Sequence, residues 1–143
     1  MSLEANKALV RRFIEEVQNQ HKLMAVDEIM DPNMIDHAAK PSSLNSVETF
    51  KKFFSGMLIT FPDLKAVIHN QVAEGDTVVT HKTFHGTHKG VFMGIPPTGK
   101  KVAIEVIDIF RIAGNKFAEH WAVVDMMNVM HQLGVLPSPG QPK

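Results

Sequence analysis

The chain has 143 residues, which is the size of one domain able to bury its own core without crosslinks. Its composition is globular, with 44% hydrophobic and 21% charged residues. The 15 basic residues balance the 15 acidic ones, which favours neither a nucleic-acid surface nor an acidic tail, and the absence of cysteine excludes disulfides and thiol chemistry.

No apolar run approaches the roughly 20 residues that span a bilayer, and no basic-then-apolar leader opens the sequence. We therefore expect a cytoplasmic protein without a membrane partner. We expect a single domain over residues 1–137, followed by a frayed, proline-rich tail over residues 138–143.

The first part of the chain predicts two helices. Apolar residues recur at helical spacing over residues 9–17, and Ser2 is placed to cap this helix. A second short helix is expected over residues 23–30, because the residue before Pro32 avoids the helical region. Residues 33–37 then predict a short strand or extended piece.

A third helix follows an expected loop at residues 40–45. Ser46 is placed to cap it and Pro62 to end it. Its apolar residues are Val47, Phe50, Phe53, Phe54, Met57, Leu58 and Phe61. The apolar face of this helix is therefore wide.

The hydrophobic period changes from 3.6 to 2 after Asp63, which is typical of strands. The expected strands are residues 64–73, 77–90, 100–111 and 117–125, with a loop at 91–99 and a last helix at 126–133. Helices followed by an antiparallel meander define an α+β fold. With few helices to cover it, the sheet is expected to be strongly curved and to wrap the N-terminal helices, leaving a deep apolar pocket.

The eight histidines do not predict a metal site. His81 and His85 share one face of a strand but lie about 13 Å apart along it, too far to bind one ion directly. His88 has the opposite parity on the same strand. Neither a nucleophile elbow nor a glycine-rich phosphate loop is present in the sequence.

The last strand carries a candidate acid/base residue. Trp121, Val123 and Asp125 share one face of this strand, and a face with tryptophan and valine is normally buried. Asp125 would then lie at an apolar cavity, where burial favours the protonated carboxyl and suits it to proton transfer. The alternative is that Asp125 caps the helix beginning at Met126.

Asp108 is the one polar residue on an apolar strand face that also carries Val106 and Phe110. Such a carboxylate needs a partner or is placed for chemistry, and both alternatives remain open. His37 is a further candidate to face inward from the early extended piece.

Five ordered motifs resemble one family. They are FPDL, EGDTVV, GTHKGVFMGIPPTGKKV, IDIFRIAGNKFAEHWAVVD and HQLGVLP. Over residues 5–137 the chain resembles the SnoaL-like polyketide (ester) cyclases of the nuclear-transport-factor-like superfamily. The resemblance implies a cone-shaped antiparallel sheet with one deep apolar pocket. It also implies ring closure by intramolecular aldol condensation without metal or cofactor.

The resemblance also assigns residues. It places the acid/base aspartate at Asp125 and implies pocket-facing positions at His37, His88, Asp108 and Trp121. Relatives often carry a large apolar residue where this chain has Lys82. An inward Lys82 would favour an anionic or enolate-bearing ligand, although a rim lysine that reaches water is the favoured alternative.

We therefore expect a cofactor-free enzyme for a small hydrophobic carbonyl compound. Asp125 would move the proton, and His37, Asp108 or His88 would bind the oxygen where negative charge develops. The expected apolar wall consists of Phe54, Met57, Phe61 and Trp121. Cyclisation, isomerisation and hydration remain open, and the alternative is a protein that binds a hydrophobic molecule without turnover.

A homodimer is expected through the convex face of the sheet. This face carries Thr77, Val79, His81, Thr83, His85, Glu105, Ile107 and Ile109. Isoleucine and valine among neutral polar residues favour a twofold contact over bare solvent.

Overall fold

The computed structural model describes residues 2–38 and 46–137, so the expected loop at 40–45 and tail at 138–143 lie outside the described residues. The helices are α1 (Leu3–Phe13), α2 (Val26–Ile29), α3 (Ser46–Thr60) and α4 (Met126–Gln132), with a π-helical segment at Ile14–Asn19 and a 3₁₀ turn at Leu23–Ala25. The strands are β1 (Met30–Asp36), β2 (Lys65–Glu74), β3 (Thr77–Thr87), β4 (Lys101–Ala113) and β5 (Lys116–Val124).

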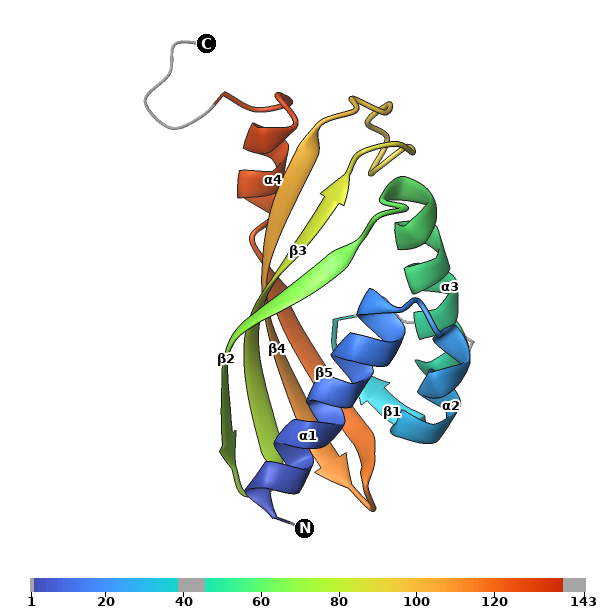
Figure 1. Cartoon of the computed structure of the whole chain (residues 1–143), viewed down its shortest axis with the longest axis vertical. Coiled ribbons are helices and arrows are strands. Elements are labelled where there is room, and N and C mark those ends of the chain that lie inside the picture. The colour runs from blue at the N-terminus through green and yellow to red at the C-terminus, as the bar shows by residue number, and fades with distance from the viewer. Residues whose placement is uncertain (1, 39–45, 138–143) are drawn as a thin grey trace.

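The predicted α+β class is confirmed. One curved sheet in the order β1-β5-β4-β3-β2 has α1, α2 and α3 against one side, and α4 lies at one end of the molecule (Figure 1). We call the side that faces α1 the inner face and the opposite side the outer face. None of the described helices has the length and apolarity that crossing a bilayer requires.

Phenylalanine rings join the helices to the inner face. The ring of Phe13 in α1 lies 5.5 Å from that of Phe50 in α3, 5.7 Å from Phe110 in β4 and 5.2 Å from Phe117 in β5. Tilted and edge-on pairs at these distances add to the free energy gained from burying the rings. This contact fixes the inner face against the helices.

The early extended piece forms a fifth strand, which the sequence left open. β1 pairs with β5 in parallel, and Asp36 lies opposite His120. β1 begins earlier than expected and includes Pro32. It is an edge strand, where the missing proline N–H is tolerated. As a result the sheet is mixed, not purely antiparallel.

A β-bulge in β5 reverses the alternation that the sequence suggested. The hairpin turns at Gly114 and Asn115, both with positive φ, and Ile112 pairs with Phe117. Arg111 then pairs with Glu119, so Ala118 is an extra residue in the ladder. An extra residue exchanges the two faces for all later positions of the strand.

The expected burial of the tryptophan-bearing face is therefore wrong. Trp121 is 36% exposed and Val123 is 72% exposed, both on the outer face. His120, which pairs with the buried Phe110, lies on the inner face instead.

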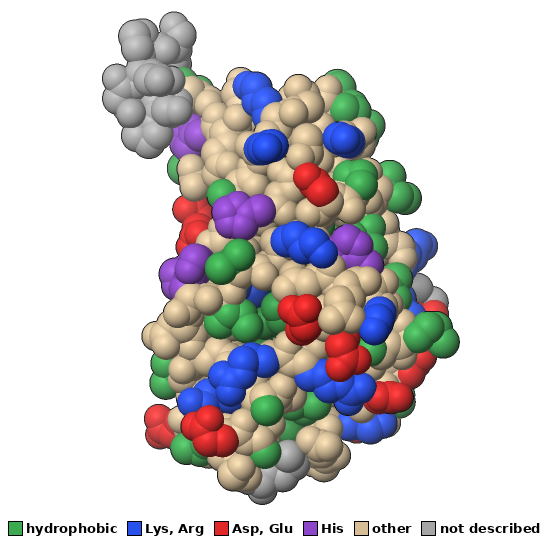
Figure 2. Space-filling model, in the orientation of Figure 1, with side chains coloured by type: hydrophobic (Ala, Val, Ile, Leu, Met, Phe, Trp, Pro, Cys, Tyr) green, Lys and Arg blue, Asp and Glu red, His purple; other side chains and the backbone are tan. Residues whose placement is uncertain are grey.

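The visible surface carries mixed charges. Figure 2 shows basic and acidic side chains interspersed with hydrophobic ones on this side of the molecule. Among the described residues on this side, charges of the two signs are mixed rather than segregated.

Candidate functional site

Four charged side chains meet on the inner face, one from each of four strands. They are Asp36 of β1, His120 of β5, Asp108 of β4 and Lys82 of β3. Asp36 lies opposite His120 in the ladder, and the strict alternation of β4 turns Asp108 toward the same side. We call these four residues, with Gln18, the inner polar network.

The contacts in this network are continuous. Lys82 forms an ion pair with one oxygen of Asp108, whose other oxygen lies 2.8 Å from His120 Nε2. His120 Nδ1 lies 2.9 Å from Asp36 Oδ1. A protonated His120 donates to both carboxylates, so two positive and two negative charges balance.

Neighbouring groups hold the buried end of the network. Lys82 Nζ donates to Gln18 Oε1 at 3.0 Å and lies 4.9 Å from the centre of the Phe84 ring. Gln18 belongs to the π-helical segment after α1, a turn type that is frequent at functional sites. The ring of Phe110 stacks on His120 at 4.4 Å.

The surroundings of His120 stabilise its charged form. Burial acts to lower the pKa of His120, but the hydrogen bonds to Asp108 and Asp36 and the charges of both carboxylates outweigh it. Together they raise the pKa of His120 from 6.5 to about 9. At neutral pH the ring is therefore an imidazolium.

Asp108 is held ionised by the same arrangement. Burial acts to raise its pKa, but the charge of Lys82 and the hydrogen bond from His120 outweigh it, and the pKa of Asp108 falls from 3.8 to about 2. Asp108 is therefore the fixed anion between two cations.

The network is closed at one end and accessible at the other. The side chain of Lys82 is 1% exposed, whereas that of Asp36 is 16% exposed. A small molecule at the inner face would therefore reach Asp36 and His120 before Asp108. These two groups are a carboxylate base and a cationic hydrogen-bond donor, the pair that proton abstraction next to a carbonyl requires.

Two predicted site residues come together here. Asp108 and Lys82 were both candidates, and they form the buried ion pair of the network. The favoured expectation of a rim lysine is wrong, because Lys82 faces inward between Asp108 and Gln18. Asp36 and His120 were missed, since the bulge at Ala118 and the parallel pairing of β1 leave no local signal in the sequence.

His37 lies apart from Asp108, on the outer side of β5. Its ring stacks on Trp121 at 4.8 Å, and its Nε2 lies 2.6 Å from a carboxylate oxygen of Glu119. Arg111 donates to the other oxygen of Glu119 at 3.0 Å. The structure therefore does not bring His37 or Trp121 to the inner polar network.

Asp125 is exposed, so its expected burial is wrong. It is the N-cap of α4, and its side chain accepts a hydrogen bond from the Asn128 backbone N–H at 3.2 Å. This is the capping alternative, typical of aspartate. A role of Asp125 in proton transfer stays a prediction that this position does not favour.

The remaining candidate residues lie in or beside an apolar cluster that joins α3, β4 and α4. His88 is fully buried, with Nδ1 3.0 Å from Thr98 Oγ1 and its ring near those of Phe61 and Phe92. Phe54 and Phe61 are buried, and Met57 packs against them. The deep pocket expected beside them stays a prediction.

Two hollows lie elsewhere on the described part of the chain. One, of about 280 Å³, lies between α1 and the turns at Gly75 and Gly114. The other, of about 370 Å³, lies beside β4 and the end of β5. Its lining residues are His81, Glu105, Val106, Ile107, Val123, Val124 and Asp125.

The curved α+β sheet with helices on its inner face is the fold of a family of small cyclases. The chain matches the model of the SnoaL-like polyketide cyclases over residues 8–133, and it belongs to this family.

Individual relatives are similar to this chain along most of its length. Nogalonic acid methyl ester cyclase of Streptomyces nogalater is 24% identical over 111 residues, which cover 76% of this chain and 83% of that protein. TsrD from Streptomyces laurentii has a TM-score of 0.86 and 27% identity, covering 95% of this chain and 99% of TsrD. AclR from Streptomyces galilaeus, proposed to be a hydroxylase, has a TM-score of 0.85 and 30% identity, covering 99% of this chain and 87% of AclR.

Replacing the buried Lys82 should lower the stability of the fold. Lys82→Met keeps most of the apolar stem but leaves Asp108 without its closest cation, so we expect the free energy of unfolding to fall by about 3–5 kcal/mol. Urea denaturation of Lys82→Met, Asp108→Asn and the double variant measures the coupling between the two residues. We expect the double variant to lose at least about 1 kcal/mol less than the sum of the single losses, whereas additive losses would contradict the ion pair.

The raised pKa of His120 predicts a pH-dependent stability. Because the pKa is 6.5 in the unfolded chain and about 9 in the folded one, the stabilisation is fully present below pH 6.5 and is lost as the pH rises through 9. The unfolding free energy of wild type minus that of His120→Gln should be about 3 kcal/mol larger at the lower end of this pH window than at its upper end. Urea denaturation across this pH window measures the difference. The control variant His85→Gln, at an exposed histidine, should show the same pH dependence of stability as wild type.

Proposed function

We propose that this protein is a cofactor-independent cyclase for a small hydrophobic carbonyl compound, with Asp36 and His120 as its acid/base pair. Membership of the SnoaL-like polyketide cyclase family supports the cyclase class. The observation that carries the residue assignment is the position of His120 between Asp36 and Asp108, at the accessible end of the inner polar network. The alternative base is Asp125 at the start of α4, which the experiment below distinguishes from Asp36.

The proposed reaction is an intramolecular aldol addition, without loss of water. The Asp36 carboxylate removes a proton from the carbon beside a carbonyl group, and the electrons of that C–H bond form an enolate. As Asp36 turns to the substrate, the Nδ1–H of His120 becomes available to donate to the enolate oxygen. The enolate carbon then attacks a second carbonyl of the same molecule, and the resulting alkoxide takes the proton from Asp36.

This reaction needs no co-reactant. The proton that leaves carbon returns to oxygen, so the cyclised product has the same composition as the substrate. Asp108 and Lys82 act behind His120 as positioning residues. The ionised Asp108 holds the imidazolium in place, and Lys82 keeps Asp108 ionised inside an apolar core.

The expected substrate is hydrophobic because the surroundings of the site are. Phe110 covers the His120 ring, and Phe50 and Phe54 stack at 5.6 Å on α3. A wall made of Phe54, Met57 and Phe61, as the sequence predicts, would exclude water and orient an aromatic or aliphatic polyketide.

Turnover should depend on Asp36 and His120. We expect Asp36→Asn and His120→Gln each to lower the rate of cyclisation at least about 100-fold, the usual contribution of general acid–base catalysis. Nogalonic acid methyl ester, the compound in the name of the Streptomyces nogalater relative, is the first substrate to test, followed by related aromatic polyketides. Chromatography with mass detection follows the substrate to a product of unchanged mass.

Matched variants separate the alternatives. Asp31→Asn, in the same strand as Asp36, should retain full activity, because Asn can accept the hydrogen bond that Asp31 takes from the Asn33 N–H. Loss of activity in Asp125→Asn with full activity in Asp36→Asn would assign the base to Asp125. A product heavier by one oxygen would indicate a hydroxylase, and tight binding without turnover would indicate a binding protein.

We also propose that the outer face of the sheet forms a homodimer. Large apolar side chains remain exposed there, among them Ile107, Trp121 and Val123. Exposed apolar groups that lie together on one face favour a contact between copies of the chain.

Sedimentation equilibrium tests this association. Wild type should sediment as a dimer at micromolar concentration, and Val123→Glu should sediment as a monomer, because a buried unpaired carboxylate is costly. Ile59→Glu, at an exposed position of α3, is the control and should remain dimeric. A monomeric wild type would contradict the proposal.

A further inference from the structure

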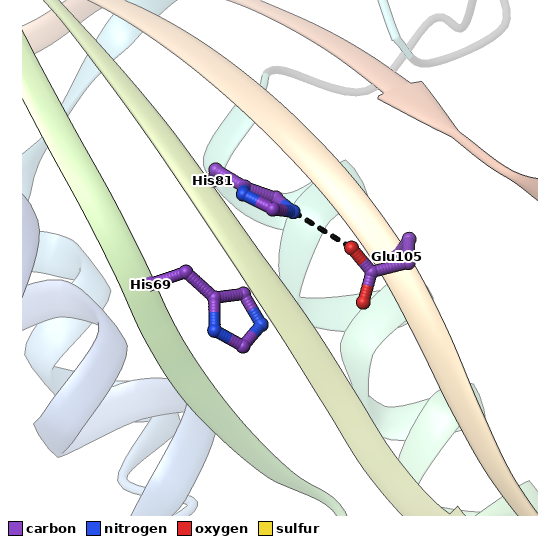
Figure 3. Close-up of side chains that lie close together, drawn as sticks. All are labelled: His69, His81 and Glu105. Carbon is purple, nitrogen blue, oxygen red and sulfur yellow. Dashed lines mark hydrogen bonds and ion pairs between the residues drawn. The ribbon is translucent and has the colours of Figure 1, made fainter.

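A second group of titratable side chains lies on the outer face, away from the inner polar network. It consists of His69 from β2, His81 from β3 and Glu105 from β4, which we call the outer histidine cluster (Figure 3). His81 Nε2 lies 2.7 Å from Glu105 Oε2, and the rings of His69 and His81 are 4.8 Å apart. The proposed cyclase mechanism makes no use of these groups.

A β-bulge in β2 lies at His69. Ile68 pairs with Lys82 and Asn70 pairs with His81, so His69 is an extra residue in the β2 ladder. Bulges re-aim a side chain and are frequent beside functional sites. Here the ring of His69 lies 4.8 Å from that of His81, although the two residues are not ladder partners.

A buried hydroxyl group organises the same residues. Thr83 Oγ1 lies 2.6 Å from His69 Nε2, and it donates a short hydrogen bond to Glu105. Thr83 is opposite Glu105 in the β3–β4 ladder and is itself buried. Hydrogen bonds of this kind orient metal ligands in known metal sites.

We propose that His69, His81 and Glu105 bind one divalent transition-metal ion, with Zn²⁺ as the best match. Two imidazoles and one carboxylate are a ligand set that zinc accepts. Their ligand atoms all lie within 4.8 Å of one another. The ligand atoms of a tetrahedral zinc site are about 3.3 Å apart. A rotation of the exposed His69 side chain that moves its ligand nitrogen by roughly 1.5 Å or less would therefore close the site.

The ion would keep an open coordination position. Three protein ligands leave a fourth position for water or another small ligand. His81 and Glu105 also line the hollow of about 370 Å³ together with Ile107, Val123 and Asp125. In the single chain, solvent reaches the cluster through this hollow, and the arrangement resembles an open zinc site more than a closed structural one.

The sequence predicted no metal site because His81 and His85, which lie along one strand, are too far apart to bind one ion. The outer histidine cluster instead draws one ligand from each of three neighbouring strands. Such a set becomes visible only after the strands are paired in register.

Zinc titration tests the proposal directly. Purified full-length protein, stripped with EDTA and dialysed, is titrated with ZnCl₂ in a calorimeter. We expect one Zn²⁺ per chain, and a dissociation constant at least about 100-fold weaker in His81→Ala and in His69→Ala, because loss of even an outer partner of a metal ligand costs 10–100-fold. Co²⁺ in place of Zn²⁺ should give the visible absorption bands of a four-coordinate ion.

His85→Ala is the matched control. His85 is an exposed histidine of β3 four residues beyond His81, outside the cluster, and its loss should leave the zinc affinity unchanged. Circular dichroism confirms that each variant is folded. Zinc binding that is undetectable, that survives in both cluster variants, or that weakens equally in His85→Ala would overturn the proposal, as would one ion for every two chains.

Discussion

Ala118 has no partner in the β4–β5 ladder, and this one extra residue determines which side chains of β5 face the helices. Without it, the two-residue turn at Gly114 and Asn115 would continue in register and direct Glu119 and Trp121 inward. With it, His120 lies against the Phe110 ring on the inner face, and Trp121 lies outside beside His37. The inner polar network therefore depends on a local irregularity of the backbone as much as on the identity of its residues.

Charge balance is the second condition for this site. An isolated charge on an apolar strand face is expensive, and Asp108 and Lys82 are each buried almost completely. Each charge is matched by a neighbour along the series from Lys82 through Asp108 and His120 to Asp36. The series ends at the partly exposed Asp36, so the proton exchange that we propose there would leave no bare charge in the core. The desolvated ion pair of Lys82 and Asp108 thus anchors the buried end of the series.

Periodicity predicted much of the fold and only part of the site. The helices and the four long strands follow from spacing, and Asp108 was identified because it interrupts an apolar face. His120 was not identified, since alternation assigns it to the wrong face once the bulge is overlooked. Asp36 depends on the parallel pairing of β1 with β5, which joins residues 84 apart in the chain. Long-range pairing of this kind leaves no periodic signal, and the same holds for the ligands of the outer histidine cluster.

The two clusters lie on opposite faces of the same strands. His81 and Lys82 are neighbours in β3, and alternation sends the first to the outer face and the second to the inner one. In β4, Glu105 and Asp108 are three positions apart, an odd spacing, and therefore point to opposite faces in the same way. The sheet therefore separates the two groups by its own thickness, and each has its own bulge, at His69 in β2 and at Ala118 in β5. Since bulges re-aim side chains without changing the hydrophobic pattern, one apolar scaffold can carry two independent polar sites.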